Sequence, residues 1–501
     1  MTRLVSRTMS RIGESEGPES GAREQRHPAR RGRLRAALSW LPEVVVVLLV
    51  LAAVANLQFH LDHRWLGLDA SSEPARVNPP AGLAITTGST APAVAATSTG
   101  RSVDADAVRA ALAPYAGAAD LGRHVDVAVS DLASGRIAYR HGAGSVTPAS
   151  TTKLLTTAAA LDRLGPMTRF RTTVRQSGGR IVLVGGGDPF LATSKSAAKG
   201  LYPARATLDD LAAATAAALT RQGTTSVRLS YDDSLFSGPT VNPAWPASYV
   251  PDGVVPPISA LWADEGQDAR GHYVADPPLA AATAFADALR SHGIDVRGAV
   301  TSAVSPSTDA ELAAVQSAPL GEIVERTLAV SDNNAAEVLG HHVGLTVRKD
   351  GSFAGGAAAV LDVLNQLGVD TSGSVLYDGS GLSRRDRLTP EALLGVLRLA
   401  TSPDHPALRP VLTGLPVAGF VGSLQARFDD APAGARGRVR AKTGTLTGVS
   451  GLAGVITDLD GNRMAFVAIA DKVDVPKTMA ARHDLDLIAS ALGTCHCGGT
   501  S

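Results

Sequence analysis

Apolar and polar residues alternate in several stretches of the chain, and this pattern predicts β-strands with one buried face. Val125, Val127 and Val129 alternate ahead of a turn at Ala133-Ser-Gly135, so residues 124–130 are expected to form the first arm of a hairpin. The same pattern predicts further strands at 137–139, 180–184, 227–231, 439–445, 451–457 and 463–470. Asp460-Gly461 is a suitable hairpin turn between the last two of these strands.

Other stretches repeat apolar residues every three or four positions, which predicts helices with one buried face. Leu154, Leu155 and Leu161 form such a face in residues 151–164, and Gly165-Pro166 ends that helix. Further helices are expected at 104–116, 278–292, 320–345 and 477–492. Strands at both ends with helices between them predict an α/β fold of the α+β sandwich type, whose two ends share one antiparallel sheet.

The first hundred residues have a different composition from the rest. Residues 1–35 contain nine Arg against four Glu, and an uninterrupted apolar run of twelve residues follows at 44–55. Twelve residues make about 18 Å of helix, so spanning a hydrocarbon core of about 30 Å requires the flanking residues as well. The predicted organisation is a cytoplasmic leader (1–35), a membrane anchor (36–57), a flexible linker (58–103), a catalytic domain (104–167 and 316–494), an inserted domain (168–315) and a tail (495–501).

The positive charge before the apolar segment places the N-terminus inside the cell and the remainder outside. We therefore expect a single-pass protein of the cell membrane with an extracytoplasmic catalytic domain. Ala53-Val-Ala55 also fits a signal-peptidase site, so secretion after cleavage is the alternative. Both interpretations export the folded part.

Charge and cysteine content exclude some functions. The formal net charge is zero, so nothing indicates a nucleic-acid partner. Cys495 and Cys497 are the two cysteines, and their cluster offers fewer than the four ligands usual for zinc. We expect an exposed tail whose cysteines are free to oxidise, and we expect neither a metal nor a cofactor.

Ser150-Thr-Thr-Lys153 opens the helix at 151–164. A serine hydroxyl is a weak nucleophile without a base, and a lysine three residues later lies on the same helical face. Backbone N–H groups at a helix N-terminus would also stabilise a developing negative charge. Ser196-Ala-Ala-Lys199 repeats the pattern, but it has no large apolar neighbours and is expected in a surface loop.

Two more motifs occur later in the chain. Ser331-Asp-Asn333 precedes a helical stretch, where an ordinary helix cap is the alternative interpretation. Lys442-Thr-Gly-Thr445 lies on a predicted strand, where an edge-strand lysine is the alternative and Gly444 would let another backbone approach closely. Only seven lysines occur in the chain, and two of them, Lys153 and Lys442, fall in the motifs.

The three motifs in this order are the signature of β-lactamases and penicillin-binding proteins. The chain resembles the class C low-molecular-mass penicillin-binding proteins, which are serine D-alanyl-D-alanine carboxypeptidases and endopeptidases, over about residues 104–494. The resemblance also rests on Gly185-Gly-Gly-Asp-Pro-Phe-Leu191, Asp232-Asp-Ser-Leu-Phe-Ser-Gly-Pro239, Pro257-Ile-Ser-Ala260 and Asp378-Gly-Ser-Gly-Leu-Ser383. It implies a penicillin-binding-protein/β-lactamase-like transpeptidase fold with an inserted, β-rich second domain.

The resemblance implies that Ser150 attacks the carbonyl between two D-Ala residues while Lys153 accepts its proton. Ser331 would pass a proton to the leaving nitrogen, Asn333 would bind the substrate backbone, and Lys442 would orient the site electrostatically. The implied activity is a D-Ala-D-Ala carboxypeptidase, with endopeptidase activity as a second expectation. Peptidoglycan stem peptides and β-lactams would be its ligands, and a β-lactam-sensing receptor or a β-lactamase is the alternative.

The resemblance also implies a substrate-binding strand. Thr443 and Thr445 would bind the carboxylate region of the substrate, with Gly444 between them. The backbone N–H groups of Ser150 and Thr445 would form an oxyanion hole, in which one donor contributes about 3 kcal/mol.

Overall fold

A computed structural model describes residues 102–177, 179–429 and 434–499, all within one compact unit, Ala95–Ser501. The predicted leader, the membrane anchor and residues 58–101 of the linker lie outside the described residues. No helix in the described part combines the length and the apolar character that a membrane span requires. The anchor therefore stays a prediction.

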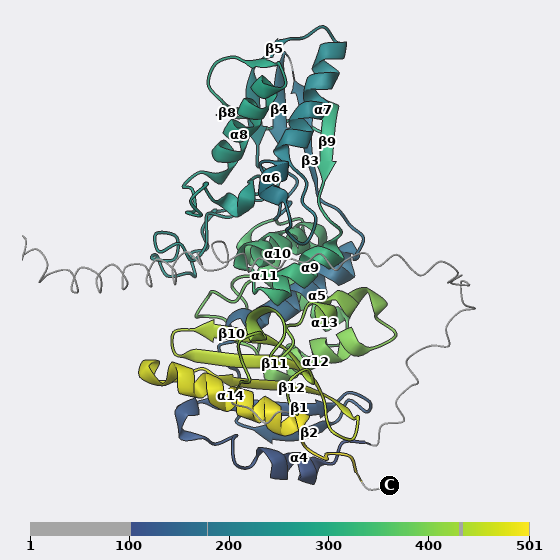
Figure 1. Cartoon of the computed structure of the whole chain (residues 1–501), viewed down its shortest axis with the longest axis vertical. Helices are drawn as coiled ribbons and strands as arrows, with labels where there is room; N and C mark the ends of the chain where they lie inside the picture. Colours follow the sequence, from purple (N-terminus) through teal and green to yellow (C-terminus); the bar gives the residue numbers. More distant parts are fainter. Residues whose placement is uncertain (1–101, 178, 430–433, 500–501) are drawn as a thin grey trace, which may run out of the picture. The chain divides into compact units, whose positions relative to one another are not determined.

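The first sheet contains five antiparallel strands in the order β10-β11-β12-β1-β2, so it joins segments from both ends of the folded part (Figure 1). Its strands are β1 (Val125–Asp131), β2 (Ile137–His141), β10 (Val439–Leu446), β11 (Val449–Thr457) and β12 (Arg463–Ala470). Every residue of β12 after Arg463 is buried, because this apolar strand lies in the middle of the sheet. The predicted α+β sandwich with a shared sheet is confirmed.

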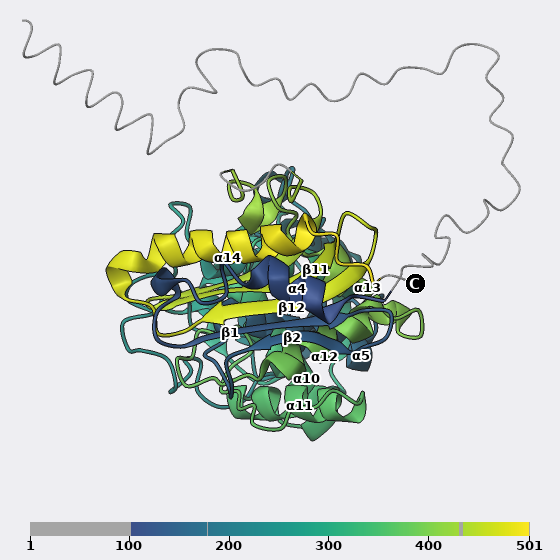
Figure 2. The same cartoon turned by 90° about the horizontal axis from the view of Figure 1, so that it is seen from below.

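Helices cover both faces of this sheet, and Figure 2 shows α14 on one side and α12 on the other. One hydrophobic core lies on each face of the sheet, and alternate residues of β12 point into one or the other. Phe466 and Ala468 pack with α14, while Val467 and Ile469 pack with α5 and α12. The helices beside the sheet are α4 (Ala105–Leu112), α5 (Lys153–Leu164), α12 (Pro390–Thr401) and α14 (Thr478–Gly493). Further helices packed in the same region are α9 (Leu320–Ala329), α10 (Asn333–Arg348), α11 (Phe353–Gln366) and α13 (Arg409–Thr413).

The stretch predicted as helical, 320–345, is helical in α9 and α10, but residues 330–332 divide it into two helices. Ser331 has a φ of +63°, which a right-handed helix cannot contain. The side chain of Asp332 then caps α10 by accepting a hydrogen bond from Ala335 N at 3.0 Å. Two helices meet at the position of the second motif.

The segment from residue 171 to residue 316 forms a second sheet of five strands (Figure 1). The strands lie in the order β8-β6-β4-β3-β9. Its strands are β3 (Arg171–Ser177), β4 (Arg180–Val184), β6 (Leu229–Asp232), β8 (Thr301–Ser302) and β9 (Ala310–Gln316). The strand predicted at 227–231 is divided into β5 (Ser226–Val227) and β6, and β5 pairs with β7 (Asp295–Val296) instead. The helices α7 (Leu208–Arg221) and α8 (Pro277–Ser291) pack on this sheet, and their apolar faces form its core. The boundaries of the inserted domain stay a prediction.

Short helical turns connect several of these elements. They are the 3-10 helices Ala119–Leu121, Ala149–Thr152, Asp264–Gly266, Pro406–Leu408, Gly422–Leu424 and Val475–Lys477, and the single-turn helix α6 (Lys195–Ala198).

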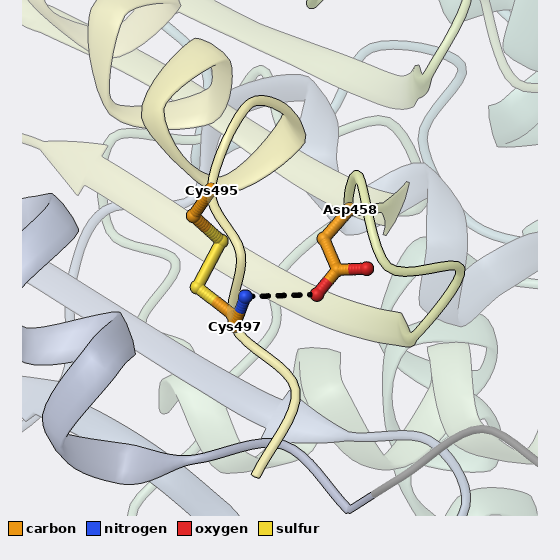
Figure 3. Close-up of side chains that lie close together, drawn as sticks. All are labelled: Asp458, Cys495 and Cys497. Carbon is orange, nitrogen blue, oxygen red and sulfur yellow. Dashed lines mark hydrogen bonds between the residues drawn. A yellow bond between two sulfur atoms is a disulfide. The ribbon is translucent and has the colours of Figure 1, made fainter. Parts of the chain in front are cut away.

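The cysteine tail is packed against the domain, which corrects the expectation that it is exposed. Cys495 and Cys497 form a disulfide, and Cys497 is fully buried. Cys497 N donates a hydrogen bond to Asp458 Oδ2 at 3.3 Å (Figure 3). Asp458 also accepts a bond from Asn462 N at 2.8 Å, so its carboxylate is already engaged. With both sulfurs in the disulfide, the tail presents no thiolate to a metal.

The tail also pairs with the start of the domain. Val103 and Gly498 form an antiparallel bridge, and Asp104 N donates to Cys497 O at 2.9 Å. Gly499 N donates to Ser102 O at 2.9 Å. The first and last described residues are therefore neighbours.

Candidate active site

Ser150 lies in the 3-10 helix Ala149–Thr152, which leads directly into α5. Its partner Lys153 is the first residue of α5, and Lys153 Nζ lies 2.9 Å from Ser150 Oγ. The helical turn accounts for this contact, because residues three apart lie on one face. The first motif therefore has the geometry of a nucleophile beside its base.

Lys153 is completely buried and its amine has three hydrogen-bond partners. Besides Ser150, Nζ donates to Asn333 Oδ1 at 2.7 Å and to the backbone oxygen of Ser380 at 2.8 Å. Asn333 begins α10, so the second motif is brought to the first by packing of α10 against α5. Three acceptors fix the position of the amine beside the serine.

Burial lowers the pKa of Lys153 to about 8, because the charged form loses its water. The negative charges of Glu337, Asp378 and Asp332 oppose this shift in that order. A pKa of about 8 leaves roughly a tenth of the amines neutral at pH 7. The neutral amine can accept a proton from the serine hydroxyl.

Ser331 and Lys442 form a second pair beside the first. Lys442 Nζ donates to Ser331 Oγ at 2.8 Å and to the backbone oxygen of Thr443 at 2.8 Å. Lys442 is completely buried, and its pKa is well below the ordinary range because of burial and the nearby charge of Lys153. Together the two lysines place amine groups beside both serine hydroxyls.

The third motif lies on β10, an edge strand that approaches the nucleophile closely. A Cβ at Gly444 would lie 2.8 Å from the backbone oxygen of Pro148, so this position requires glycine. Thr443 Oγ1 lies 3.0 Å from Ser423 Oγ, and Thr445 is exposed. From Lys442 to Leu446 β10 pairs with β11 on one side, and no described strand lies along its other edge. That edge can accept an extended peptide.

The structure adds Glu337, to which the sequence motifs assigned no role. Glu337 follows Asn333 by one helical turn in α10, is only 1% exposed and accepts hydrogen bonds from two backbone groups. Gly379 N donates at 3.0 Å and Ser380 N at 2.8 Å. Glu337 thus holds the segment whose carbonyl accepts a bond from Lys153. Burial, with the charge of Asp378, raises the pKa of Glu337 to about 8.

The Asp378-Gly-Ser-Gly-Leu-Ser383 segment also appeared in the sequence without a chemical role. Asp378 accepts hydrogen bonds from Gly381 N at 2.7 Å and from Trp245 Nε1 at 2.7 Å. Gly381 has a φ of +82°, and a Cβ there would lie 1.9 Å from the backbone oxygen of Ala149. This segment therefore packs directly behind the nucleophile. Its two glycines were the available signal, since glycine marks close backbone approach.

The second serine-lysine pattern lies on the surface, as predicted, although in the single-turn helix α6 rather than a loop. Ser196 and Lys199 are both exposed. Lys195 in the same turn pairs with Asp210 at 3.0 Å. Ser196 and Lys199 therefore lack the buried setting that holds Lys153 beside Ser150.

The sequence matches the D-Ala-D-Ala carboxypeptidase 3 (S13) family over residues 108–270 and 269–492. The protein belongs to this family. Carboxypeptidase Rv3627c of Mycobacterium tuberculosis is 37% identical over 400 residues, which are 78% of this chain and 84% of that protein. Carboxypeptidase DacB of Mycolicibacterium smegmatis is 35% identical over 380 residues, which are 74% of this chain and 80% of that one.

The solved structure of penicillin binding protein 4 (dacB) from Haemophilus influenzae has the same fold. It superimposes with a TM-score of 0.63 at 22% identity and covers 76% of this chain and 98% of that one. The expected fold, family and enzyme class are thereby confirmed. The member described here is a serine-type D-Ala-D-Ala carboxypeptidase.

Proposed function

We propose that the protein removes the terminal D-Ala from peptidoglycan stem peptides through an acyl-enzyme on Ser150. The observation that carries this proposal is the 2.9 Å contact between Lys153 Nζ and Ser150 Oγ. The second pair, Lys442 and Ser331, lies 2.8 Å apart and supplies a separate route for the proton.

The neutral form of Lys153 accepts the proton of Ser150 as Oγ attacks the carbonyl carbon between the two D-Ala residues. The proton then returns through Ser331 to the leaving nitrogen, so that the C–N bond breaks and the terminal D-Ala departs as an amine. Lys442 keeps Ser331 in position by its hydrogen bond. Water hydrolyses the remaining ester and restores the serine.

The substrate lies along the open edge of β10 in this proposal. Thr443 and Thr445 bind its carboxylate region, and Asn333 binds its backbone amide. The backbone N–H groups of Ser150 and Thr445 receive the negative oxygen of the tetrahedral intermediate. The pairing of β10 with β11 keeps Gly444 against Pro148, which favours close approach of the strand to the nucleophile.

β-Lactams acylate the same serine in this proposal, because their strained amide occupies the position of the D-Ala-D-Ala bond. Penicillin binding protein 4 of Haemophilus influenzae has been solved in complex with a β-lactam. A β-lactam receptor and a β-lactamase would share the acylation step but differ in the fate of the acyl-enzyme, which the receptor keeps and the β-lactamase hydrolyses quickly.

We further propose that residues 36–57 anchor the protein in the cell membrane and that the catalytic domain lies outside the cytoplasm. The Arg-rich leader supports this orientation, and secretion after cleavage near Ala53-Val-Ala55 is the other outcome. Detection of the leader and the catalytic domain on one membrane-bound chain would favour the anchor.

The test compares Ser150→Ala with the matched control Ser196→Ala in the full chain. Both proteins are incubated with fluorescent penicillin and with a stem peptide that ends in D-Ala-D-Ala. Ser150→Ala is expected to lose labelling and D-Ala release, while Ser196→Ala keeps both.

Labelling that survives in Ser150→Ala would contradict the proposal. Labelling of the parent chain without D-Ala release would favour a β-lactam receptor. Rapid destruction of penicillin would favour a β-lactamase. Cleavage of cross-linked dimers would add endopeptidase activity.

A further inference from the structure

A hollow of about 350 Å³ lies between the first sheet and the helices α12 and α13. Its lining includes no residue of the three motifs. Arg440 on β10 lines this hollow and precedes Lys442 by two residues, so the two side chains leave the strand on the same face. The hollow is therefore close to the catalytic strand but separate from the nucleophile.

Three arginines converge on this hollow from three elements. Arg440 pairs with Val455 of β11, and Arg463 of β12 pairs with Thr457 of β11. Because Val455 and Thr457 are two positions apart, Arg440 and Arg463 lie on the same face of the sheet. Arg409 enters from the first residue of α13 on the opposite wall.

The three arginines of the hollow form no ion pair with the residues that the structure describes, although Glu325 accepts a hydrogen bond from Thr413 of the lining at 2.5 Å. No carboxylate lines the hollow. Among the residues that the structure describes, no acceptor lies within hydrogen-bonding or ion-pair distance of the guanidinium groups of Arg409, Arg440 and Arg463. Asp404 is exposed and accepts a bond from Ser402, and it is not part of the lining. Arg409, Arg440 and Arg463 are exposed, so water already screens their mutual repulsion, and an anion between them would reduce it further.

The rest of the lining combines an apolar floor with hydroxyl groups. Leu132, Leu412 and Val455 supply apolar surface. The hydroxyls of Thr401 and Thr413 also line the hollow, but they already donate to Arg398 O and to Glu325 Oε1, so the arginines are left to bind an anion. Guanidinium groups bind carboxylates and phosphates through paired hydrogen bonds. An apolar pocket of a few hundred Å³ with a few convergent polar groups is typical of small-molecule sites.

We propose that this hollow binds a small organic anion that carries a phosphate group, or two or more carboxylates, beside an apolar group. The arginines bind the acidic groups, and the apolar floor covers the rest of the ligand. The site does not depend on the proposed peptidase function, because it shares no lining residue with the three motifs.

The test measures binding of trimellitate, a benzene ring with three carboxylates, to the full chain by titration calorimetry. The triple variant Arg409→Gln, Arg440→Gln, Arg463→Gln is expected to bind roughly tenfold or more weakly, since hydrogen bonds to charged groups are lost. The matched control replaces three exposed arginines outside the hollow, Arg123, Arg221 and Arg270, by glutamine and should bind like the parent. Both triple variants should keep penicillin labelling, which reports a folded catalytic site.

Inorganic pyrophosphate and phenyl phosphate distinguish the ligand classes. If phenyl phosphate competes with trimellitate, the natural ligand can carry a phosphate. If trimellitate binds and phenyl phosphate does not, the site prefers carboxylates. Absence of saturable binding, or equal affinity of the parent and the hollow variant, overturns the proposal. Pyrophosphate that binds more tightly than both aromatic anions overturns the role of the apolar floor. Loss of trimellitate binding after acylation with penicillin would place the ligand at Ser150 and overturn the separate site.

Discussion

The surroundings of Lys153 shift the pKa of its amine in opposite directions. Complete burial favours the neutral amine, whereas the carboxyl groups of Glu337, Asp378 and Asp332 favour the ammonium form. The result is a pKa of about 8, more than two units below the ordinary value of 10.5. A lysine with this pKa can take a proton from serine near neutral pH.

This pKa sets the pH dependence of acylation. Because only the neutral amine acts as a base, the rate should rise with pH and level off above a midpoint near 8. The measurement is the second-order rate constant for penicillin labelling between pH 6 and 9.5. A rate that stays constant across this range would show that Lys153 does not supply the base.

Replacing Glu337 by glutamine should change both the midpoint and the maximum rate. Glu337 has a pKa of about 8, so it is partly ionised near the midpoint, and losing this negative charge lowers the pKa of Lys153 and should move the midpoint to lower pH. In glutamine an NH2 group takes the place of one carboxylate oxygen, so either Gly379 N or Ser380 N loses its hydrogen-bond acceptor. The plateau rate should therefore fall roughly tenfold.

The matched control for this variant is Glu311→Gln, which removes an exposed carboxylate from β9. It should leave the pH profile unchanged. A purely structural role of Glu337 would lower the plateau without moving the midpoint.

The break between α9 and α10 shows which parts of an element could be predicted from the sequence. The apolar spacing on either side correctly indicated helix, and alternation correctly indicated β10, β11 and β12. The Ser331-Asp-Asn333 motif did indicate a helix cap, and Asp332 caps α10, but nothing local indicated the positive φ of Ser331. Its side chain is held by Lys442, which is 111 residues away in the chain.

Gly381 allows a test of the segment behind the nucleophile. An alanine there would combine a strained φ of +82° with a Cβ that lies 1.9 Å from the backbone oxygen of Ala149. Gly381→Ala should therefore lower stability by more than the roughly 1–3 kcal/mol of backbone strain alone, and it should slow penicillin labelling.

Gly368 is a suitable control because its φ is +78° and nothing lies within 4 Å of an added Cβ. Gly368→Ala should lower the thermal midpoint through backbone strain but leave the labelling rate unchanged. Equal labelling rates in the two variants would mean that Gly381 does not position Ser150.

At the scale of the whole molecule, the site depends on contacts between distant parts of the chain. Lys153 meets Asn333 across 180 residues and Ser380 across 227 residues. The ordered motifs predicted that such residues meet, because their combination is a family signature. They could not predict Ser380, because it contributes a backbone oxygen, which no side-chain motif records.

The burial of the cysteine tail also depends on contacts with distant parts of the chain, which the local sequence does not indicate. A short segment with glycines and no apolar run is typical of an exposed end, yet Cys497 is buried. Its hydrogen-bond partners Asp104 and Asp458 come from the start of the domain and from the turn after β11, so the burial depends on the assembled domain.

Two changes to the tail should have different effects on stability. The disulfide closes a very short loop, so replacing both cysteines by serine should cost about 1–2 kcal/mol. Deleting residues 495–501 also removes the pairing of Val103 with Gly498. The truncated chain should therefore have a lower thermal midpoint than both the parent and the double serine variant. Calorimetric scans provide the comparison, and a truncated chain that melts with the parent would show that the tail does not stabilise the domain.

The pairing of Ser102 with Gly499 has a topological consequence. Since these residues are hydrogen-bonded neighbours, a short peptide could join them and turn the described part of the chain into a closed ring. Such a ring could be opened at the exposed turn Gln222-Gly223, which follows α7. The resulting circular permutant would keep all three motifs in one fold, although Lys442 would then precede Ser150 in the chain.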